Sequence, residues 1–406
     1  IEWRLLRVLT GIEDNILADI PSRAVILTPR LLPSDTIHMN TRNAVAFVTE
    51  EGSRSSHSAI LARALDLPYV SNVNSRIFTS IPQRGEIIVD GNKGRIIINP
   101  GPEEKQNAIS DQTKKKRKFR SIKKKLVTKS FMMGDDPIGI LSNISNAEDA
   151  TLAAESNVDG IGLFRLEALY MAKSVLPNER DLVNDFVKIL KPVQNLPVTI
   201  RLLDIGGDKS LPYLKTESGR NPLLGLRGVR VLKKYPGLLR TQLRAFIRLA
   251  KDHEMKILIP MASIADDIVF IRSALENECK KLNSSCSIKI GAMIETPSAI
   301  MDIDNIIANS DFLSIGTNDL IQYAVAADRE KLSCSEYYEA GAELIIKSLG
   351  TVIQKSRTAG IDCVICGEMA ADTEYTKALL DSGFRQFSVA PARINKLRKA
   401  LADILG

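Results

Sequence analysis

The sequence has few of the residues that build metal sites and disulfide frameworks. Its 406 residues include three histidines, five cysteines and one tryptophan. No cluster of histidine and cysteine has the spacing of zinc ligands, which argues against a zinc site. Five cysteines are few for this length and odd in number, so they favour unpaired thiols in a reducing compartment over a disulfide framework.

Long apolar runs are missing as well. The sequence contains no apolar run of about 18 residues or more, and its start has no signal-peptide pattern. We therefore expect no membrane insertion and a cytoplasmic location. The apolar content of 44% is typical of a globular protein with room for two or three domains. The chain begins with Ile1 rather than methionine, as a fragment of a longer protein would.

The net charge of +7 comes largely from one basic segment. It contains the run Lys114–Arg120 and a second run, Lys123–Lys125. A local run of this kind is usually a solvated helix face, and no recognised nucleic-acid-binding motif accompanies it. We therefore expect no nucleic-acid partner.

Short apolar runs predict a small α/β module in the first 100 residues. Strands are expected at 24–27 and 44–48, followed by a hairpin that pairs 86–90 with 95–98. Glycines in the connection Gly91–Gly94 suit the positive φ angles of a hairpin turn.

A polar and basic stretch at about 103–130 predicts a helical linker after this module. Such a linker would let the module move relative to the remainder of the chain. The expected domains are therefore 1–100, a linker at 101–135, and a third part at 136–406.

One histidine lies where a helix is expected to begin. Ser55 and Ser56 are helix-capping residues, and the apolar helix formers that follow place His57 in the first turn. Free N–H groups and the helix dipole there disfavour an imidazolium and favour an added anion such as a phosphoryl group. The alternative is an ordinary surface histidine beside a cap.

Strand-like and helix-like segments alternate from about residue 137 onward. Eight strands are expected, at 138–141, 160–164, 198–203, 256–260, 288–294, 312–315, 363–365 and 384–388. This number and rhythm predict a (β/α)8 TIM barrel, whose active site lies at the carboxyl ends of the strands. A doubly wound sheet is the structural alternative.

Polar residues collect at the expected strand ends, where they are costly unless they face a ligand, a metal or one another. Glu295 and Asp319 suit a Mg²⁺ ion held partly by water and substrate oxygens. Alternatively, each acid pairs with an arginine in a salt-bridge network.

The arginines of this region indicate the class of substrate. Arg165, Arg201 and Arg329 carry planar guanidinium groups that match phosphate and carboxylate, so a small anion with several charges is the expected substrate. Lys209 and Arg227 would add to that field.

Two cysteines, Cys363 and Cys366, have the spacing of thioredoxin-like sites. Residues three apart on a strand point to opposite faces, so their sulfur atoms should diverge. This geometry favours Cys366 as a lone functional thiol and Cys363 as a packing residue. A disulfide between them is the alternative.

Several segments resemble one family of enzymes. Residues 52–63 read G-S-R-S-S-H-S-A-I-L-A-R, which resembles the phosphohistidine signature of enzymes that exchange phosphate with phosphoenolpyruvate. Further similar segments follow in the family's order, at 160–167, 201–209, 221–227, 295–297, 316–320, 328–329 and 366–368. The segment 201–213 has the form found in Enzyme I of the sugar phosphotransferase system, and the similarity covers essentially the whole chain.

The resemblance implies a swivelling phosphohistidine domain at 1–100 and a phosphoenolpyruvate-binding barrel at 136–406. It also implies roles for individual residues. Phosphoenolpyruvate would bind through Arg165, Arg201, Asn318 and Arg329, with Asp319, Arg227 and Lys209 also at the substrate site. Magnesium would bind to Glu295 and Asp319, His57 would take the phosphoryl group, and Cys366 would protonate the enolate to give pyruvate.

The family also implies partners, and some of its features are missing here. Onward transfer to the phosphocarrier HPr and a homodimer formed through the barrel are expected. From the resemblance we expect the helical domain that docks HPr to be absent from this chain. The loop Cys334–Tyr338 lacks the family's proline pattern, and Leu166 stands where threonine is common. Two alternatives are a fragment related to pyruvate phosphate dikinase or phosphoenolpyruvate synthase, and a truncated inactive regulatory paralogue.

Overall fold

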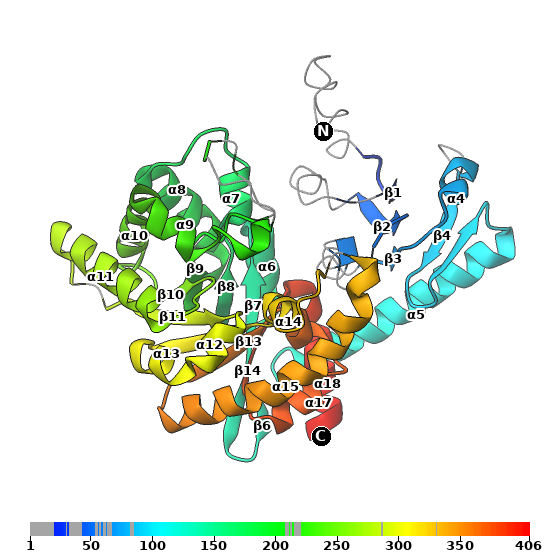
Figure 1. Cartoon of the computed structure of the whole chain (residues 1–406). Coiled ribbons are helices and arrows are strands. Elements are labelled where there is room, and N and C mark those ends of the chain that lie inside the picture. The colour runs from blue at the N-terminus through cyan, green and yellow to red at the C-terminus, as the bar shows by residue number, and fades with distance from the viewer. Residues whose placement is uncertain are drawn as a thin grey trace. The chain divides into compact units, whose positions relative to one another are not determined.

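The structure is a computed structural model, and it describes residues 20–29, 31, 43–52, 56, 58, 59, 62, 67–81, 85–207, 211, 213, 214, 221–285, 287–329 and 331–406. Contacts between residues divide the chain into two units, coloured from blue to red in chain order in Figure 1. The first unit comprises Ile1–Ser121 and Asp328–Glu336, and the second comprises Ile122–Ala327 and Tyr337–Gly406. His57 and Lys209 lie outside the described residues, so the predictions made for them stay predictions.

The first unit contains a parallel sheet and a hairpin. Its sheet has the order β1 (Ala24–Thr28), β2 (Ala44–Thr49) and β3 (Tyr69–Val70), and the antiparallel hairpin pairs β4 (Ile87–Asp90) with β5 (Arg95–Ile98). A short helix, α4 (Ser75–Ser80), lies between β3 and β4 in the chain. The strands predicted in this region are confirmed, while the two-residue β3 is too short to leave a periodic signal.

A long helix follows the hairpin, as the sequence predicted. Helix α5 (Pro102–Leu126) begins beside Glu104, whose carboxylate accepts a hydrogen bond from the Gly101 N–H at 2.9 Å. Acidic residues in this first turn also suit the positive end of the helix dipole.

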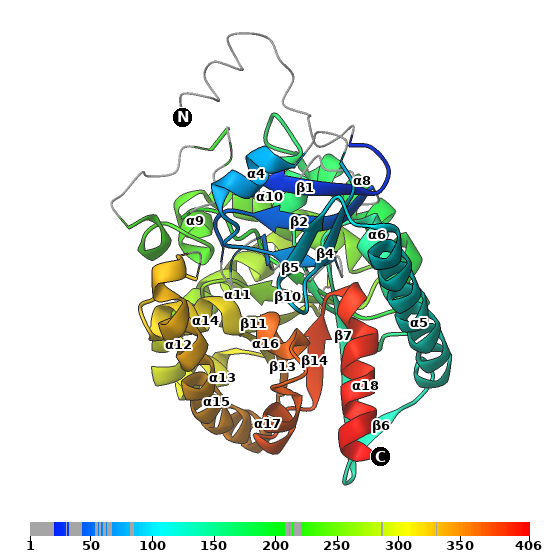
Figure 2. The same ribbon diagram turned by 90° about the vertical axis from the view of Figure 1, so that its right-hand side faces the viewer.

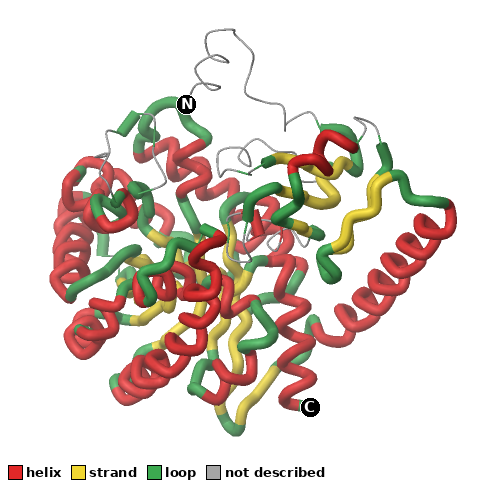
Figure 3. Tube along the Cα trace, turned by 45° about the vertical axis from the view of Figure 1, so that its right-hand side comes forward, coloured by secondary structure: helices red, strands yellow, loops and turns green. Residues whose placement is uncertain are grey.

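The second unit is a closed barrel of parallel strands surrounded by helices, as the yellow strands and red helices of Figure 3 show. Its eight strands, all among the described residues, are β7 (Asp136–Ile144), β8 (Gly160–Phe164), β9 (Val198–Arg201), β10 (Met255–Ile259), β11 (Lys289–Ile294), β12 (Phe312–Gly316), β13 (Asp362–Cys366) and β14 (Gln386–Val389). Strand β14 pairs with β7 and closes the ring, which excludes a doubly wound sheet. A short strand, β6 (Phe131–Met133), pairs antiparallel with β7. The predicted (β/α)8 barrel is therefore confirmed.

Helices cover the outside of this ring, and several of them are visible in Figure 2. They are α6 (Ala147–Glu155), α7 (Glu167–Met171), α8 (Glu179–Leu190), α9 (Val229–Lys234), α10 (Pro236–Leu249), α11 (Ala265–Lys281), α12 (Pro297–Met301), α13 (Ile303–Asn309), α14 (Thr317–Ala324), α15 (Ser335–Thr358), α16 (Glu368–Ala371), α17 (Thr376–Asp381) and α18 (Ile394–Leu405). None of the described helices is long and apolar enough to cross a membrane.

Alternation along the strands separates the outer core from the barrel interior. In β10, Ile257 and Ile259 belong to the large core cluster under the helices, whereas Leu258 belongs to a small cluster with Met293 and Cys366. Because side chains on a strand alternate between faces, this small cluster fills the inside of the barrel. The same period places the side chains of polar residues near the strand ends inside the barrel, at the end where active sites of this fold lie.

The cysteines agree with the sequence predictions in part. Cys334, Cys363 and Cys366 are free, so the disulfide considered for the Cys363–Cys366 pair is absent from the structure. Cys279, in α11, is disulfide-bonded, and the expectation of an unpaired thiol is wrong for this residue. Cys279 is about nine-tenths buried near the end of α11, and nothing in the sequence pattern there indicated that it would form a disulfide.

Three aromatic rings join the barrel to its helical layer, and they provide a test of the packing. The ring of Phe186 in α8 lies 5.7 Å from that of Phe164 in β8 and 5.8 Å from that of Phe246 in α10. We expect Phe186→Ala to lower the free energy of unfolding by about 3–5 kcal/mol, because it leaves a cavity at a fully buried site. Urea denaturation measures the effect, with Val187→Ala as the control, since Val187 is 52% exposed on the same helix. Equal losses in the two variants would contradict this packing.

Candidate active site

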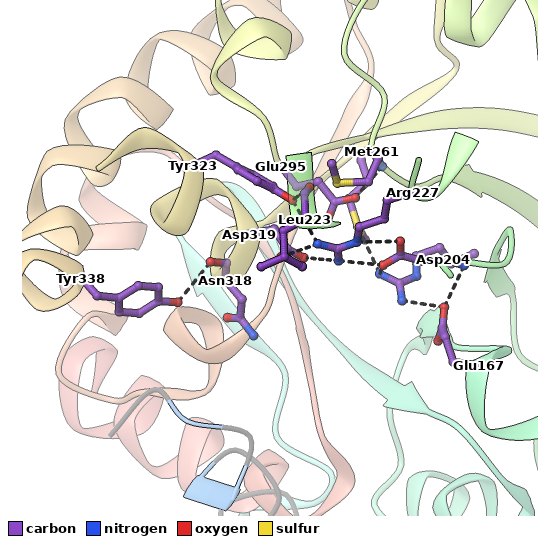
Figure 4. A network of polar contacts seen from close by, with 12 residues as sticks. Glu167, Asp204, Leu223, Arg227, Met261, Glu295, Asn318, Asp319, Tyr323 and Tyr338 are labelled. Carbon is purple, nitrogen blue, oxygen red and sulfur yellow. Dashed lines mark hydrogen bonds and ion pairs between the residues drawn. The ribbon is translucent and has the colours of Figure 1, made fainter. Parts of the chain in front are cut away.

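Charged side chains converge at the carboxyl ends of the barrel strands, as Figure 4 shows. Glu167 follows β8, Arg201 ends β9 and Asp204 lies three residues later. Glu295 follows β11, and Asp319 lies in the first turn of α14, directly after β12. These side chains follow four strands, β8, β9, β11 and β12, of one closed parallel sheet, so their convergence at the carboxyl ends follows from the topology.

Arg201 is buried inside the barrel and is held by two acids. Its Nη2 donates to Glu167 Oε1 at 2.8 Å, and its Nη1 lies 3.4 Å from Asp204 Oδ2. Burial alone would lower the pKa of this guanidinium, but Glu167, Asp204 and Glu295 raise it, so Arg201 stays charged. The Nε atom is buried and has no hydrogen-bond partner among the described residues. A buried donor of this kind is costly unless a ligand accepts from it.

Arg227 is the bridge between two carboxylates from different parts of the barrel. Its Nε and Nη2 donate to the two oxygens of Asp204 at 3.1 and 3.0 Å, and its Nη1 and Nη2 donate to those of Asp319 at 3.0 and 2.9 Å. Nη1 also donates to the Tyr323 hydroxyl at 3.2 Å. These bonds use all five N–H groups of the guanidinium. The loop that carries Arg227 is anchored by a β-bridge to Gly206, which has a φ of 101°.

Glu295 is a buried acid whose ionisation is strongly disturbed by this environment. It is 1% exposed, and its Oε1 accepts a hydrogen bond from the Met261 N–H at 2.6 Å. Burial, followed by the nearby charge of Asp319, raises the pKa of this carboxyl to about 8. Gly316 lies against it, and a Cβ there would meet Glu295 Oε2 at 2.8 Å. Only glycine leaves the carboxylate enough room at this position.

Cys366 supplies a buried neutral thiol at the end of β13. Its Sγ donates to the Ile315 carbonyl at 3.0 Å and accepts from the Ser314 hydroxyl at 3.5 Å. Burial raises the pKa of the thiol, although the Ser314 hydrogen bond and the charge of Arg165 lower it in part. The thiol therefore keeps its proton at neutral pH and is available as an acid.

Asn318 and Arg165 border the network without joining it. Asn318 Oδ1 accepts from the Glu368 N–H at 2.8 Å, and the Asn318 carbonyl accepts from Tyr338 at 3.2 Å. The Arg165 side chain is half-buried and forms no ion pair among the described residues, although its charge reaches Cys366. Both residues therefore have donors left for a ligand.

The structure brings most of the predicted site residues together. Arg201, Arg227, Glu295 and Asp319 belong to one network, and Arg165, Asn318 and Cys366 lie at the same end of the barrel. Arg329 belongs to the segment Asp328–Glu336 of the first unit, and its role stays a prediction, as do those of His57 and Lys209.

Some contributors to the network were not expected from the sequence. Glu167 and Asp204 belong to the polar residues that follow the expected strands, but the sequence assigned them no role, and it gave none to Met261 or Tyr338. The position of each acid just after a strand was a usable signal. The contacts of Met261 and Tyr338 were not predictable from the sequence. Any residue can donate its main-chain N–H, and a single tyrosine in a helix gives no sign of which carbonyl its hydroxyl contacts.

The donor set fits a hard divalent cation. Glu295 and Asp319 offer carboxylate oxygens, which Mg²⁺ prefers, and such a site takes its other ligands from water and substrate. The buried acids Glu167, Asp204, Glu295 and Asp319 face the buried arginines Arg201 and Arg227, so negative charge is in excess among them. Burial, and then the charges of Asp319 and Asp204, raise the pKa of Glu295, and a bound cation would favour its ionised form. Among the described residues, no group of three or more His, Cys, Asp or Glu side chains is arranged to hold a metal alone.

Comparisons with known proteins agree with this geometry. Residues 120–405 match the family model described as PEP-utilising enzyme, PEP-binding domain, and residues 20–94 match PEP-utilising enzyme, mobile domain. The phosphoenolpyruvate-protein phosphotransferase of Priestia megaterium is 34% identical to this chain, over 99% of the chain and 71% of that protein. Those of Geobacillus stearothermophilus and Bacillus subtilis are each 35% identical, over 99% and 97% of this chain and 70% and 71% of their own lengths.

The raised pKa of Glu295 predicts a pH dependence of stability in metal-free protein. The folded carboxyl keeps its proton up to about pH 8, whereas the unfolded chain loses it near the ordinary value of 4.5. Between these values the folded state binds the extra proton, so stability falls as the pH rises, by roughly 1.4 kcal/mol per pH unit from this group.

Glu295→Gln should remove this contribution, so the variant should gain stability relative to the wild type between pH 5 and pH 8. Urea denaturation in the presence of EDTA measures the difference. Glu276→Gln, at an exposed position of α11, is the matched control and should show no such trend. A difference between wild type and Glu295→Gln that is constant with pH would mean that the carboxyl is already ionised.

Proposed function

Because this chain belongs to the family of phosphoenolpyruvate-protein phosphotransferases, we propose that it transfers the phosphoryl group of phosphoenolpyruvate to His57 and releases pyruvate. One observation in particular supports the proposal. Arg201 has a buried guanidinium with an N–H that no described residue accepts, and Cys366 has a buried neutral thiol at the same end of the barrel. The first suits an anion, and the second suits protonation of a carbanion-like product.

Substrate binding in this proposal depends on the arginines. Phosphoenolpyruvate carries a phosphate and a carboxylate, and planar guanidinium groups match both. Arg201 would donate from Nε, Arg165 from its half-buried side chain, and Asn318 from its amide nitrogen. Arg329 and Lys209 would complete the site, with Arg227 acting on it through Asp319.

Glu295 and Asp319 would hold Mg²⁺, with water and substrate oxygens as the other ligands. When bound, the metal would neutralise charge on the phosphate during transfer, which is the main requirement of this chemistry. Met261 already orients Glu295 through its N–H, and Arg227 orients Asp319. The residues are thus positioned by the chain itself.

The transfer itself exchanges one bond for another at phosphorus. The bond between phosphorus and the enol oxygen breaks while an imidazole nitrogen of His57 forms a bond to phosphorus. The leaving group is the enolate of pyruvate, and its methylene carbon takes the proton of the Cys366 thiol. Burial favours the protonated thiol at neutral pH, which suits Cys366 to this role.

His57 belongs to the part of the chain that matches the family's mobile domain, residues 20–94. We infer that 1–100 acts as a swivelling phosphohistidine domain, that 101–135 is the linker with α5 at its centre, and that 136–406 is the catalytic barrel. His57 would approach the barrel to take phosphate and leave it again to pass phosphate to HPr. A cytoplasmic location and a homodimer formed through the barrel complete the proposal.

The phosphorylated intermediate gives the most direct test. Incubation with phosphoenolpyruvate and Mg²⁺ should add one acid-labile phosphate to the intact chain, as measured by mass spectrometry. His57→Ala should abolish the adduct, while His253→Ala, at another of the three histidines, should keep it. EDTA should prevent labelling, and ATP or AMP should have no effect, unlike in a dikinase or synthase. A labelled His57→Ala protein would place the phosphate on a different residue.

The paired cysteines of β13 test the proton donor. Cys366→Ala should slow pyruvate release about 100-fold or more, because an acid positioned at the reacting carbon is lost. Binding of phosphoenolpyruvate should persist in this variant, since the thiol contributes no charge. Cys363→Ala removes a buried thiol three residues earlier on the same strand and should leave the rate nearly unchanged. Similar rates in the two variants would exclude Cys366 as the acid.

A further inference from the structure

We propose that a cavity at the amino-terminal end of strands β10 and β11 binds a small phosphorylated compound, separately from the proposed active site. The cavity measures about 600 Å³, which is within the usual range for small-molecule sites. It lies between the ends of α10 and α11 and the starts of the two strands. Its lining residues are Ile247, Ala250, Lys251, His253, Glu254, Met255, Lys256, Asn283, Ser284, Ser285, Ser287, Ile288 and Lys289.

The position of the cavity separates it from the chemistry described above. Active sites of (β/α)8 barrels lie at the carboxyl ends of the strands, whereas this cavity lies at the opposite end. Strand β11 begins at Lys289 in the cavity and is followed at its other end by Glu295. An anion bound in the cavity would therefore contact the first residue of the strand that positions Glu295.

Charge in the cavity favours an anion. Lys251, Lys256 and Lys289 contribute three positive charges, and Glu254 is the acid among the described lining residues. Lys251 and Lys289 form no ion pair with any described residue. Lys256 lies 4.0 Å from Asp362, a long contact, and 5.6 Å from the centre of the Phe312 ring. Among the described residues, Lys251 and Lys289 therefore keep a positive charge in the lining that no acid pairs.

Two of these lysines are placed side by side by the sheet. Lys256 and Lys289 are register partners on the parallel strands β10 and β11, so their side chains leave the same face of the sheet. Like charges at directly opposite positions destabilise a sheet. Because the Lys256 ammonium already lies near Asp362 and the Phe312 ring, Lys289 is the lysine of this pair whose charge is left for an anion.

The remaining polar groups of the cavity indicate which chemical groups the anionic ligand would carry besides its negative charge. Ser284, Ser285 and Ser287 offer hydroxyl groups, and Asn283 offers a side-chain amide. His253 Nδ1 is buried and has no hydrogen-bond partner among the described residues. Lysines with hydroxyl, amide and imidazole groups suit a phosphate ester that carries hydroxyl groups, and they do not suit an apolar ligand.

Equilibrium dialysis of the full chain against radiolabelled pyrophosphate, in EDTA, tests the site. The double variant Lys251→Gln, Lys289→Gln should bind at least about tenfold more weakly, because each lost contact to a charged group is worth over 1 kcal/mol. The matched control Lys188→Gln, Lys347→Gln removes two exposed lysines elsewhere on the barrel and should bind like the wild type. Ser285→Glu keeps both lysines, adds a negative charge to the cavity and should weaken binding as well.

Arg165→Gln separates this cavity from the proposed active site. If the cavity binds the anion, Arg165→Gln keeps the dialysis signal that the lysine variants lose. If Arg165→Gln alone abolishes the signal, or if the lysine variants bind like the wild type, the inference is overturned. The lysine variants should still form the phosphoenolpyruvate-dependent adduct, so failure here is distinguishable from failure of the proposed function.

Discussion

The site depends on one interaction, the double pairing of Arg227 with Asp204 and Asp319. Asp204 follows β9, Asp319 follows β12, and the loop carrying Arg227 lies between them in the chain. Isolated buried carboxylates are very costly, and removing one partner of a buried ion pair is strongly destabilising. With Arg227 between them, both carboxylates have a charged partner inside the barrel and are held in fixed positions. Arg201 pairs with Asp204, and Glu295 lies within reach of the charge of Asp319, so both depend on the positions of these two acids.

The same network explains why protons stay on other groups nearby. Burial, and then the charges of Asp319 and Asp204, raise the pKa of Glu295, and burial raises the pKa of the Cys366 thiol. The barrel end therefore combines fixed charges with two neutral acids that can release a proton when their surroundings change. A divalent cation would favour the ionised form of Glu295, whereas the thiol would keep its proton for the reaction. Burial and the distance to neighbouring charges are therefore enough to give Glu295 and Cys366 these different roles.

Much of this was predictable from sequence because parallel barrel strands are buried on both faces. Such strands are nearly continuous apolar runs, so all eight were found, and the polar residue after each run marked the site. The pairing of Arg227 was not predictable, because Asp204 and Asp319 lie 23 and 92 residues away and either acid had several possible partners. Strand β3 was missed because two residues carry no period, and the disulfide of Cys279 because an odd cysteine count favoured free thiols.

The hydrogen bonds also distinguish Arg201 from Arg227, two arginines that the family resemblance places together at the substrate site. Every N–H of Arg227 already donates to Asp204, Asp319 or Tyr323, so this side chain has no donor left for a substrate. Arg201 is equally buried, yet its Nε has no partner among the described residues. A ligand phosphate or carboxylate would gain an unused donor from Arg201 but would have to displace an existing bond at Arg227. The balance favours Arg201 as the residue that touches the substrate and Arg227 as the residue that positions Asp319.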